Sequence, residues 1–137
     1  MLKYLLPGIV LMLNYLSVYC AEPDLDKIRG RIVEEIISQK VDDDKVKLLV
    51  NSFREDGTWP GINYQDLSRT GFEHRIHSEN IVTLARAWTK PESDFYQSDR
   101  VKQIIESALE FWARNDFICD NWWHNQIGTP SKFVTVM

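Results

Sequence analysis

The sequence predicts an all-α domain built from helical hairpins. Apolar residues recur at three- and four-residue spacing in four separate stretches, and no stretch alternates apolar and polar residues as a strand would. Acidic or hydroxylated residues stand where helices should begin, and Gly and Pro fall between the stretches. With 137 residues, 44% hydrophobic and 26% charged, the chain is long enough for one globular domain.

Residues 1–20 look like a secretory signal peptide rather than part of the fold. Lys3 supplies a positive start, and the apolar run 4–16 is too short to span a bilayer as a mature helix. We expect cleavage before Ala21, which leaves residues 21–137 as the mature domain.

The two cysteines bear on processing and on cross-linking. In the alternative to simple secretion, Cys20 becomes a lipidated first residue, but Tyr19 is bulky where such signals prefer a small side chain. After cleavage Cys119 is the only thiol left, so we expect no disulfide within the mature chain and a fold held by packing alone.

The charge balance limits the partners. The formal net charge is −4, and removing residues 1–20 with their one charge, on Lys3, takes it to −5. An acidic chain is unsuited to nucleic acid or to a polybasic membrane contact, so we expect neither, and no membrane span. An acidic polysaccharide would have to meet a local basic groove.

The first two helices are marked by apolar spacing and acidic starts. Asp24–Ser38 carries isoleucines and a leucine on one helical face, and Asp26 complements the helix dipole. Asp42–Asp44 then begin a second helix with an apolar face of Val46, Leu49, Val50 and Phe53. We interpret Asp42–Asp44 as a solvated helix start, because a calcium loop needs spaced oxygen ligands and a glycine.

An irregular connection, Arg54–Thr70, follows the second helix. Asp56-Gly57 and Pro60-Gly61 are turn signals within it. Loops of this length either carry function or pack as an ordered cover. For Trp59 and Tyr64 we favour packing onto the helices over contact with a ligand.

Gly71–Lys90 and Ser98–Asn115 are the third and fourth expected helices, and the fourth has an apolar face wide enough to pack on two sides. His74 and His77 lie three residues apart on the third. No third ligand and no His-Glu-x-x-His pattern accompanies them, so we expect hydrogen bonds to the neighbouring loop and no metal or other cofactor.

The segment 121–130 is the most informative in the chain. Neighbouring side chains diverge on a helix or a strand, so we expect an irregular loop, which can turn both Trp122 and Trp123 toward one groove. The amides of Asn121, Asn125 and Gln126 add hydrogen-bonding groups beside the rings. Flat apolar faces beside amides suit a sugar ring, which has an apolar face and a polar rim.

Simpler interpretations of the same residues stay open. Trp122 and Trp123 suit core packing about as well as a sugar platform, and Asn125 and Gln126 suit loop hydrogen bonds as well as ligand contact. His124 fits either use. Thr129-Pro130 fits the N-cap and first position of a fifth helix.

Four motifs point to one family. Asp56–Pro60, Ile62–Tyr64, Arg69–Phe72 and Asp120–Pro130 resemble the N-terminal helical domain of polysaccharide lyase family 8, and the resemblance covers residues 21–137. It implies a partial α/α toroid with a long cleft, continued by further toroid helices and β-sandwich domains that would be partners of this segment. The family cleaves uronic-acid-containing polysaccharides, such as chondroitin, hyaluronan and xanthan, by β-elimination.

The resemblance also assigns roles. It implies that Trp122 and Trp123 form the aromatic patch under an acidic polysaccharide, with Asn121 as their polar neighbour. The family's catalytic Asn, His, Tyr and Arg lie C-terminal to this patch, so no residue here is assigned a catalytic role. We therefore expect the N-terminal fragment of a secreted lyase that is inactive alone. The alternatives are a non-catalytic sugar-binding module and a toroidal glycoside hydrolase using carboxylates such as Asp116 and Asp120.

Overall fold

The computed structural model describes residues 24–36 and 38–136, which fall in two units, Met1–Gln39 and Lys40–Met137, each considered by itself. The described residues form helices and no strand, as expected for an all-α protein. None of the helices within those ranges has the length and hydropathy to cross a membrane. The expected signal peptide and the cleavage site before Ala21 lie outside the described residues.

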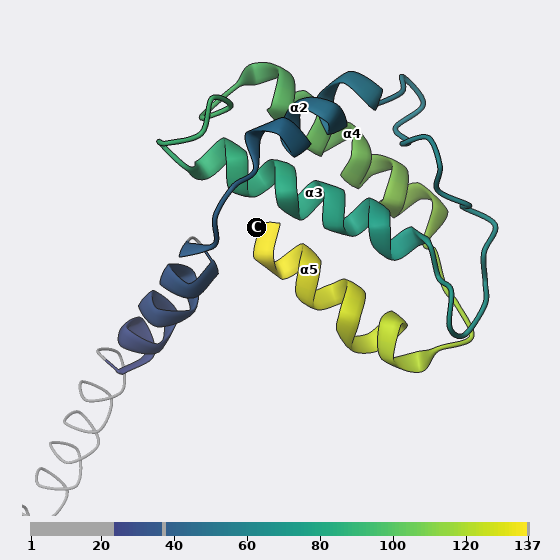
Figure 1. The fold of residues 1–137 in the computed structure, drawn as a ribbon. Coiled ribbons are helices and arrows are strands. Elements are labelled where there is room, and N and C mark those ends of the chain that lie inside the picture. Colours follow the sequence, from purple (N-terminus) through teal and green to yellow (C-terminus); the bar gives the residue numbers. More distant parts are fainter. Residues whose placement is uncertain (1–23, 37, 137) are drawn as a thin grey trace, which may run out of the picture. The chain divides into compact units, whose positions relative to one another are not determined.

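In the first unit, residues 24–36 form a helix, as their spacing predicts (Figure 1). Among residues 24–36 no second element packs against the apolar stripe of this helix. Leu25, Ile28 and Ile32 are accordingly exposed.

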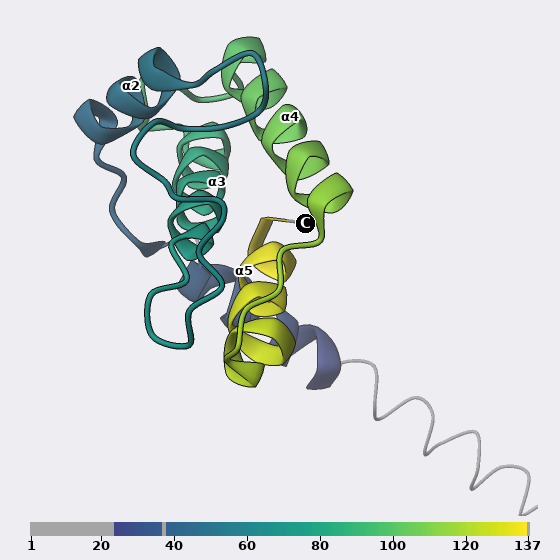
Figure 2. The ribbon, with the colours of Figure 1, turned by 90° about the vertical axis from the view of Figure 1, so that its right-hand side faces the viewer.

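The second unit is organised around α3 (His74–Thr89). It contacts α2 (Asp43–Ser52), α4 (Asp99–Asn115) and α5 (Thr129–Val136), and Figures 1 and 2 show α3 in the middle of these helices. In Figure 1, α3 and α5 run in one direction and α4 runs in the other, so the chain forms antiparallel hairpins.

The start of α2 agrees with the sequence and adds a tertiary contact. Asp42 caps the helix by accepting from the backbone N–H of Lys45 at 3.1 Å. Asp43 is more than a solvated charge, because its carboxylate accepts from Ser93 Oγ at 2.6 Å and from the backbone N–H of Asp94 at 3.2 Å. These bonds join α2 to the α3–α4 connection.

The connection between α2 and α3 packs as a cover, as predicted. Trp59 is 2% exposed, and its indole N–H donates to the carbonyl oxygen of Leu49 at 3.0 Å. At Gly57, which has a φ of 88°, an added Cβ would lie 2.8 Å from Cβ of Phe111. The loop therefore lies against both α2 and α4.

The third helix begins at His74, three residues after the predicted Gly71. Phe72 is fully buried with a φ of 38°, a left-handed conformation that cannot continue a helix. An added Cβ on Gly71 would lie 2.5 Å from Oδ2 of Asp66. The tight turn around Asp66 thus sets the start of α3.

The prediction of an irregular loop at 121–130 is wrong. Residues 122–136 are helical throughout, with the π-helical turn η2 (His124–Gly128) leading into α5. Asn121, not Thr129, caps this run, because its Oδ1 accepts from the backbone N–H of Trp123 at 3.1 Å.

Thr129 lies inside the run, with helical φ and ψ of −72° and −50°. Its N–H donates five residues back, to the carbonyl oxygen of His124. Pro130 lacks an N–H and its ring crowds the carbonyl four residues earlier, so a widened π turn in front of it lets the helix continue.

Candidate functional site

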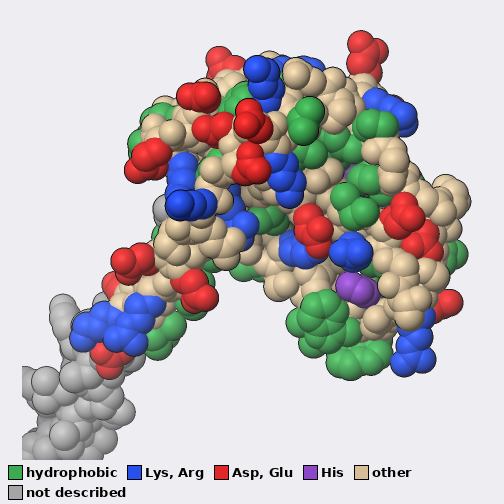
Figure 3. Space-filling model, viewed as in Figure 1, with side chains coloured by type: hydrophobic (Ala, Val, Ile, Leu, Met, Phe, Trp, Pro, Cys, Tyr) green, Lys and Arg blue, Asp and Glu red, His purple; other side chains and the backbone are tan. Residues whose placement is uncertain are grey.

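Two adjacent indole rings stand exposed at the start of the η2–α5 helix. Trp122 is 59% exposed and Trp123 is 45% exposed. Figure 3 shows hydrophobic side chains gathered on the surface at this end of the molecule. Because neighbours on a helix point about 100° apart, the two rings do not share one orientation, yet neither lies in the core. The alternative of core packing for Trp122 and Trp123 does not hold.

The ring of Trp123 lies along its own helix. An added Cβ on Gly128 would lie 2.6 Å from Cζ3 of Trp123, so only glycine gives the ring room there. The wide π turn brings the two residues to one face of the helix. One side of the Trp123 ring thus packs against its own helix, and the other side is exposed.

The amides beside the rings are engaged in the fold. Oδ1 of Asn121 caps the helix, and its Nδ2 donates to the carbonyl oxygen of Arg69 at 3.1 Å. Asn125 donates to the carbonyl oxygen of Cys119 at 2.8 Å and accepts from its N–H at 3.1 Å. Each amide thus uses its oxygen and one of its two N–H groups within the fold. The side chain of Gln126 is exposed.

Behind the exposed rings lies a buried aromatic cluster. The ring of His124 lies 5.3 Å from that of Phe72, and His74 stacks on Phe117 with 4.3 Å between ring centroids. His74 is fully buried and its Nε2 bonds the carbonyl oxygen of Tyr64 at 2.6 Å. Its Nδ1 has no partner among the described residues. The cluster gives the aromatic segment a rigid base.

A hydrogen-bonded chain holds His77 neutral. The carbonyl oxygen of Ala108 can only accept, so Nε2 of His77 donates to it at 3.0 Å. Nδ1 then accepts from Tyr64 Oη at 2.9 Å, and Tyr64 Oη itself accepts from the backbone N–H of Trp59 at 3.2 Å. Burial lowers the pKa of His77 from 6.5 to about 4 and raises the pKa of Tyr64.

These bonds decide how the two helix histidines are used. Both ring nitrogens of His77 are occupied, so it has no lone pair to offer a metal ion. Across the described ranges, no group of three His, Cys, Asp or Glu side chains is placed to hold one. His74 and His77 bond to the loop and to α4, which agrees with the expected hydrogen bonds.

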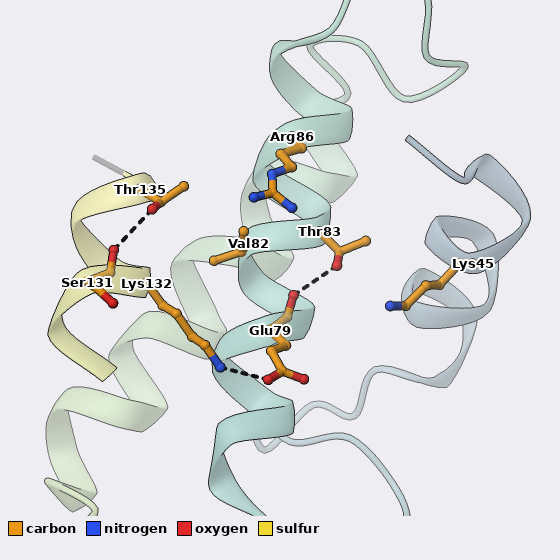
Figure 4. Close-up of a pocket in the computed structure, with 8 residues that line it drawn as sticks. All are labelled: Lys45, Glu79, Val82, Thr83, Arg86, Ser131, Lys132 and Thr135. Atoms are coloured by element: carbon orange, nitrogen blue, oxygen red, sulfur yellow. Dashed lines mark hydrogen bonds and ion pairs between the residues drawn. The ribbon is translucent and has the colours of Figure 1, made fainter. Parts of the chain in front are cut away.

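A second feature is a pocket of about 420 Å³ between α3 and α5, lined also by Lys45 of α2 (Figure 4). It holds three cationic side chains, Lys45, Arg86 and Lys132, and one carboxylate, Glu79. Glu79 pairs with Lys132 at 2.7 Å. No local pattern in the sequence predicts this pocket, because its charges come from three helices that only packing brings together.

The fold and the aromatic segment both match known proteins. Residues 26–137 match the sequence profile of polysaccharide lyase family 8, N-terminal alpha-helical domain. Chondroitinase-AC of Pedobacter heparinus is 32% identical over 81 residues, which are 59% of this chain and 12% of that protein.

A solved structure of chondroitinase AC lyase with bound oligosaccharides superimposes with a TM-score of 0.70 at 26% identity, over 76% of this chain and 16% of the other. This chain therefore spans less than a fifth of the length of either relative. Its hairpins form part of an α/α toroid, as the resemblance implied. The chain belongs to polysaccharide lyase family 8, and its described helices are those of the family's N-terminal α-helical domain.

Proposed function

We propose that this chain supplies the sugar-binding aromatic end of a lyase that cleaves uronic-acid-containing polysaccharide, chondroitin or hyaluronan, by β-elimination. The observation that carries the proposal is the exposure of Trp122 and Trp123 on a braced helix in a member of this family. The relatives named above are chondroitinases, which supports an acidic polysaccharide as ligand.

Sugar binding would be favoured because it buries apolar surface of the indole rings and costs little side-chain entropy. An exposed indole offers a large flat face, and covering it with the C–H face of a sugar removes apolar area from water. Because Gly128 already supports the ring of Trp123, little side-chain freedom is lost on binding. We expect the side-chain N–H groups of Asn121 and Asn125 that are not used within the fold to donate to sugar hydroxyls.

We do not place catalysis on His74, His77 or Tyr64. β-Elimination needs a neutralised carboxylate, a base for the C5 proton and an acid for the leaving oxygen. Both nitrogens of His77 are hydrogen-bonded and His74 is fully buried. Tyr64 Oη is held between Trp59 and His77. We propose that the catalytic groups lie in other parts of the lyase.

Calorimetric titration with a chondroitin tetrasaccharide tests the proposal. Trp122→Ala and Trp123→Ala should each weaken binding by about tenfold, or about 1.4 kcal/mol. Tyr96→Ala is the control, because Tyr96 is also an exposed aromatic residue but lies beyond the other end of α3, near Trp88. Equal affinities of all three variants and the original chain would reject the aromatic platform.

A non-catalytic module and a hydrolase are the two alternatives, and the reaction product distinguishes them from a lyase. A non-catalytic module would bind the same sugars through Trp122 and Trp123 whether or not any lyase chemistry accompanies it. A hydrolase would need paired carboxylates, but Asp116 and Asp120 are exposed, and Asp116 is the left-handed C-cap of α4. Membership of a lyase family favours elimination, and the ultraviolet absorbance of an unsaturated uronate product distinguishes it from hydrolysis.

We also propose that the protein is exported, by simple secretion or through a lipid on Cys20. The support is the charge and hydropathy pattern of residues 1–20. N-terminal sequencing of the exported protein should begin at Ala21. A blocked, lipid-modified Cys20 would establish the anchored form, and retention of Met1 in the cytoplasm would reject export.

A further inference from the structure

The pocket between α3 and α5 is rich in positive charge that the protein does not neutralise. Glu79 is its only lining carboxylate, and it pairs with Lys132 and, at 3.8 Å, with Arg75 outside the pocket. Within the described part of the chain, no carboxylate lies within 4 Å of the side-chain nitrogens of Lys45 or Arg86. The lining thus carries an excess of two positive charges.

Arg86 has a buried donor without a partner. Its Nε is buried and makes no hydrogen bond to any described residue. Because Nε is closed to water, a ligand in the pocket would meet the terminal Nη atoms of Arg86, which carry the same positive charge and suit a carboxylate or sulfate. Figure 4 shows the guanidinium group of Arg86 on the pocket side of α3, with the ammonium group of Lys45 pointing into the same space.

The hydroxyl groups of the pocket can accept hydrogen bonds from a ligand but have no free proton to donate. Thr83 donates to the carbonyl oxygen of Glu79, Ser131 to that of Gly128 and Thr135 to that of Ser131. Their protons are therefore used, and their oxygens remain as acceptors. A bare anion gains nothing from such oxygens, whereas a sugar can donate its own hydroxyl protons to them.

We propose that this pocket binds an acidic sugar unit, with Lys45 and Arg86 taking its carboxylate or sulfate and the Thr83, Ser131 and Thr135 oxygens taking its hydroxyls. The proposal rests on the proposed function, since it places a second part of the same polysaccharide beside the tryptophans. A volume of about 420 Å³ is in the range of small-ligand sites.

The pocket and the aromatic end share one helix and one face. The helix rises by roughly 10 Å from His124 to Ser131, at about 1.5 Å per residue. Figure 3 shows basic side chains on the same face as the hydrophobic side chains at the start of that helix. A polysaccharide that rests on Trp122 and Trp123 can therefore extend along α5 to the charged pocket.

A pair of lysines on α2 gives a matched test. Lys45 lines the pocket, whereas Lys47 lies two residues further along the same helix, is equally an exposed lysine and does not line it. We would titrate chondroitin sulfate, hyaluronan and chitin hexasaccharides into the full chain and into Lys45→Met, Lys47→Met and Arg86→Gln. Hyaluronan carries carboxylates alone and chondroitin sulfate carries carboxylates and sulfates, so their difference isolates the effect of sulfate, and chitin hexasaccharide is neutral.

Lys45→Met and Arg86→Gln should each weaken binding of an acidic hexasaccharide by roughly fivefold, the size of one partly exposed charge pair, and the loss should shrink in high salt. Lys47→Met should change nothing, and none of the three should affect chitin hexasaccharide. Equal losses of affinity in Lys45→Met and Lys47→Met, or no loss in Lys45→Met and Arg86→Gln, would show that the pocket does not bind the acidic sugar.

The tryptophan variants separate the two proposals. If Trp122→Ala weakens binding and Lys45→Met does not, the tryptophan platform is supported and sugar binding in the pocket is rejected. If Lys45→Met and Arg86→Gln weaken binding and Trp122→Ala and Trp123→Ala do not, the pocket is supported and the platform is rejected.

Discussion

The side-chain amide of Asn125 pairs with both backbone polar groups of Cys119, donating to its carbonyl oxygen at 2.8 Å and accepting from its N–H at 3.1 Å. This contact fastens the π turn to the segment that leaves α4. Because Cys119 is buried, water could not replace these two hydrogen bonds if the amide of Asn125 were removed. These two hydrogen bonds between Asn125 and Cys119, here called the Asn125 clamp, therefore hold the helix that carries the exposed tryptophans against the domain.

Asn125→Ala should destabilise the domain by about 1–3 kcal/mol, because it leaves the buried N–H and carbonyl groups of Cys119 without partners. Chemical denaturation monitored by circular dichroism measures the loss. Gln126→Ala is the control at the next position, since its exposed side chain should matter by less than about 0.5 kcal/mol. Equal stabilities of the two variants would show that the clamp contributes nothing.

Gly128→Ala should move the ring of Trp123. Alanine is the better helix former, but its Cβ would lie 2.6 Å from Cζ3 of Trp123, so the indole must swing outward. We expect a red-shifted tryptophan emission and weaker sugar binding with little loss of helix content. In Gly30→Ala, where nothing lies within 4 Å of the added Cβ, emission and binding should stay as in the original chain.

Acid should destabilise the fold through His77. Its pKa is about 4 in the folded protein and 6.5 when unfolded, so between these values the unfolded state binds the extra proton. The contribution to stability is complete above pH 6.5 and falls by about 3 kcal/mol as the pH drops toward 4.

The free energy of unfolding measured from pH 4 to 7 tests this. His77→Gln cannot titrate, so its stability should fall less steeply over the interval than that of the original chain. Parallel pH curves for the two proteins would mean that other groups cause the acid sensitivity.

Removing a buried tryptophan should cost far more stability than removing an exposed one. Trp59 is 2% exposed and bonded to Leu49, so Trp59→Ala should cost about 3–5 kcal/mol. Trp122 is 59% exposed, and Trp122→Ala should leave stability within about 0.5 kcal/mol. Thermal melts of both variants give the comparison, and a large loss from Trp122→Ala would place that ring in the core.

Local signals predicted the elements well. The caps at Asp42 and Ser98 work as their sequence suggests, because a cap depends on residues one turn apart. The cover formed by Trp59 and Tyr64 followed from the length and composition of its loop.

Signals that compete or act over long range were misjudged. Thr129-Pro130 has the sequence of a helix start, but Asn121 caps the helix earlier and a π turn accommodates Pro130. The start of α3 shifted because Phe72 adopts a left-handed conformation that only its burial explains. For Asn125 the sequence left loop hydrogen bonds and ligand contact open, because its partner Cys119 is brought to it only by the fold.

The central claim is that Trp122 and Trp123 carry the sugar. The most direct measurement is an NMR titration that follows the indole N–H signals of the five tryptophans as a chondroitin oligosaccharide is added. The signals of Trp122 and Trp123 should shift together and saturate, while those of the more buried Trp59 and Trp112 stay in place. Saturable binding that leaves the Trp122 and Trp123 signals unmoved would contradict the account.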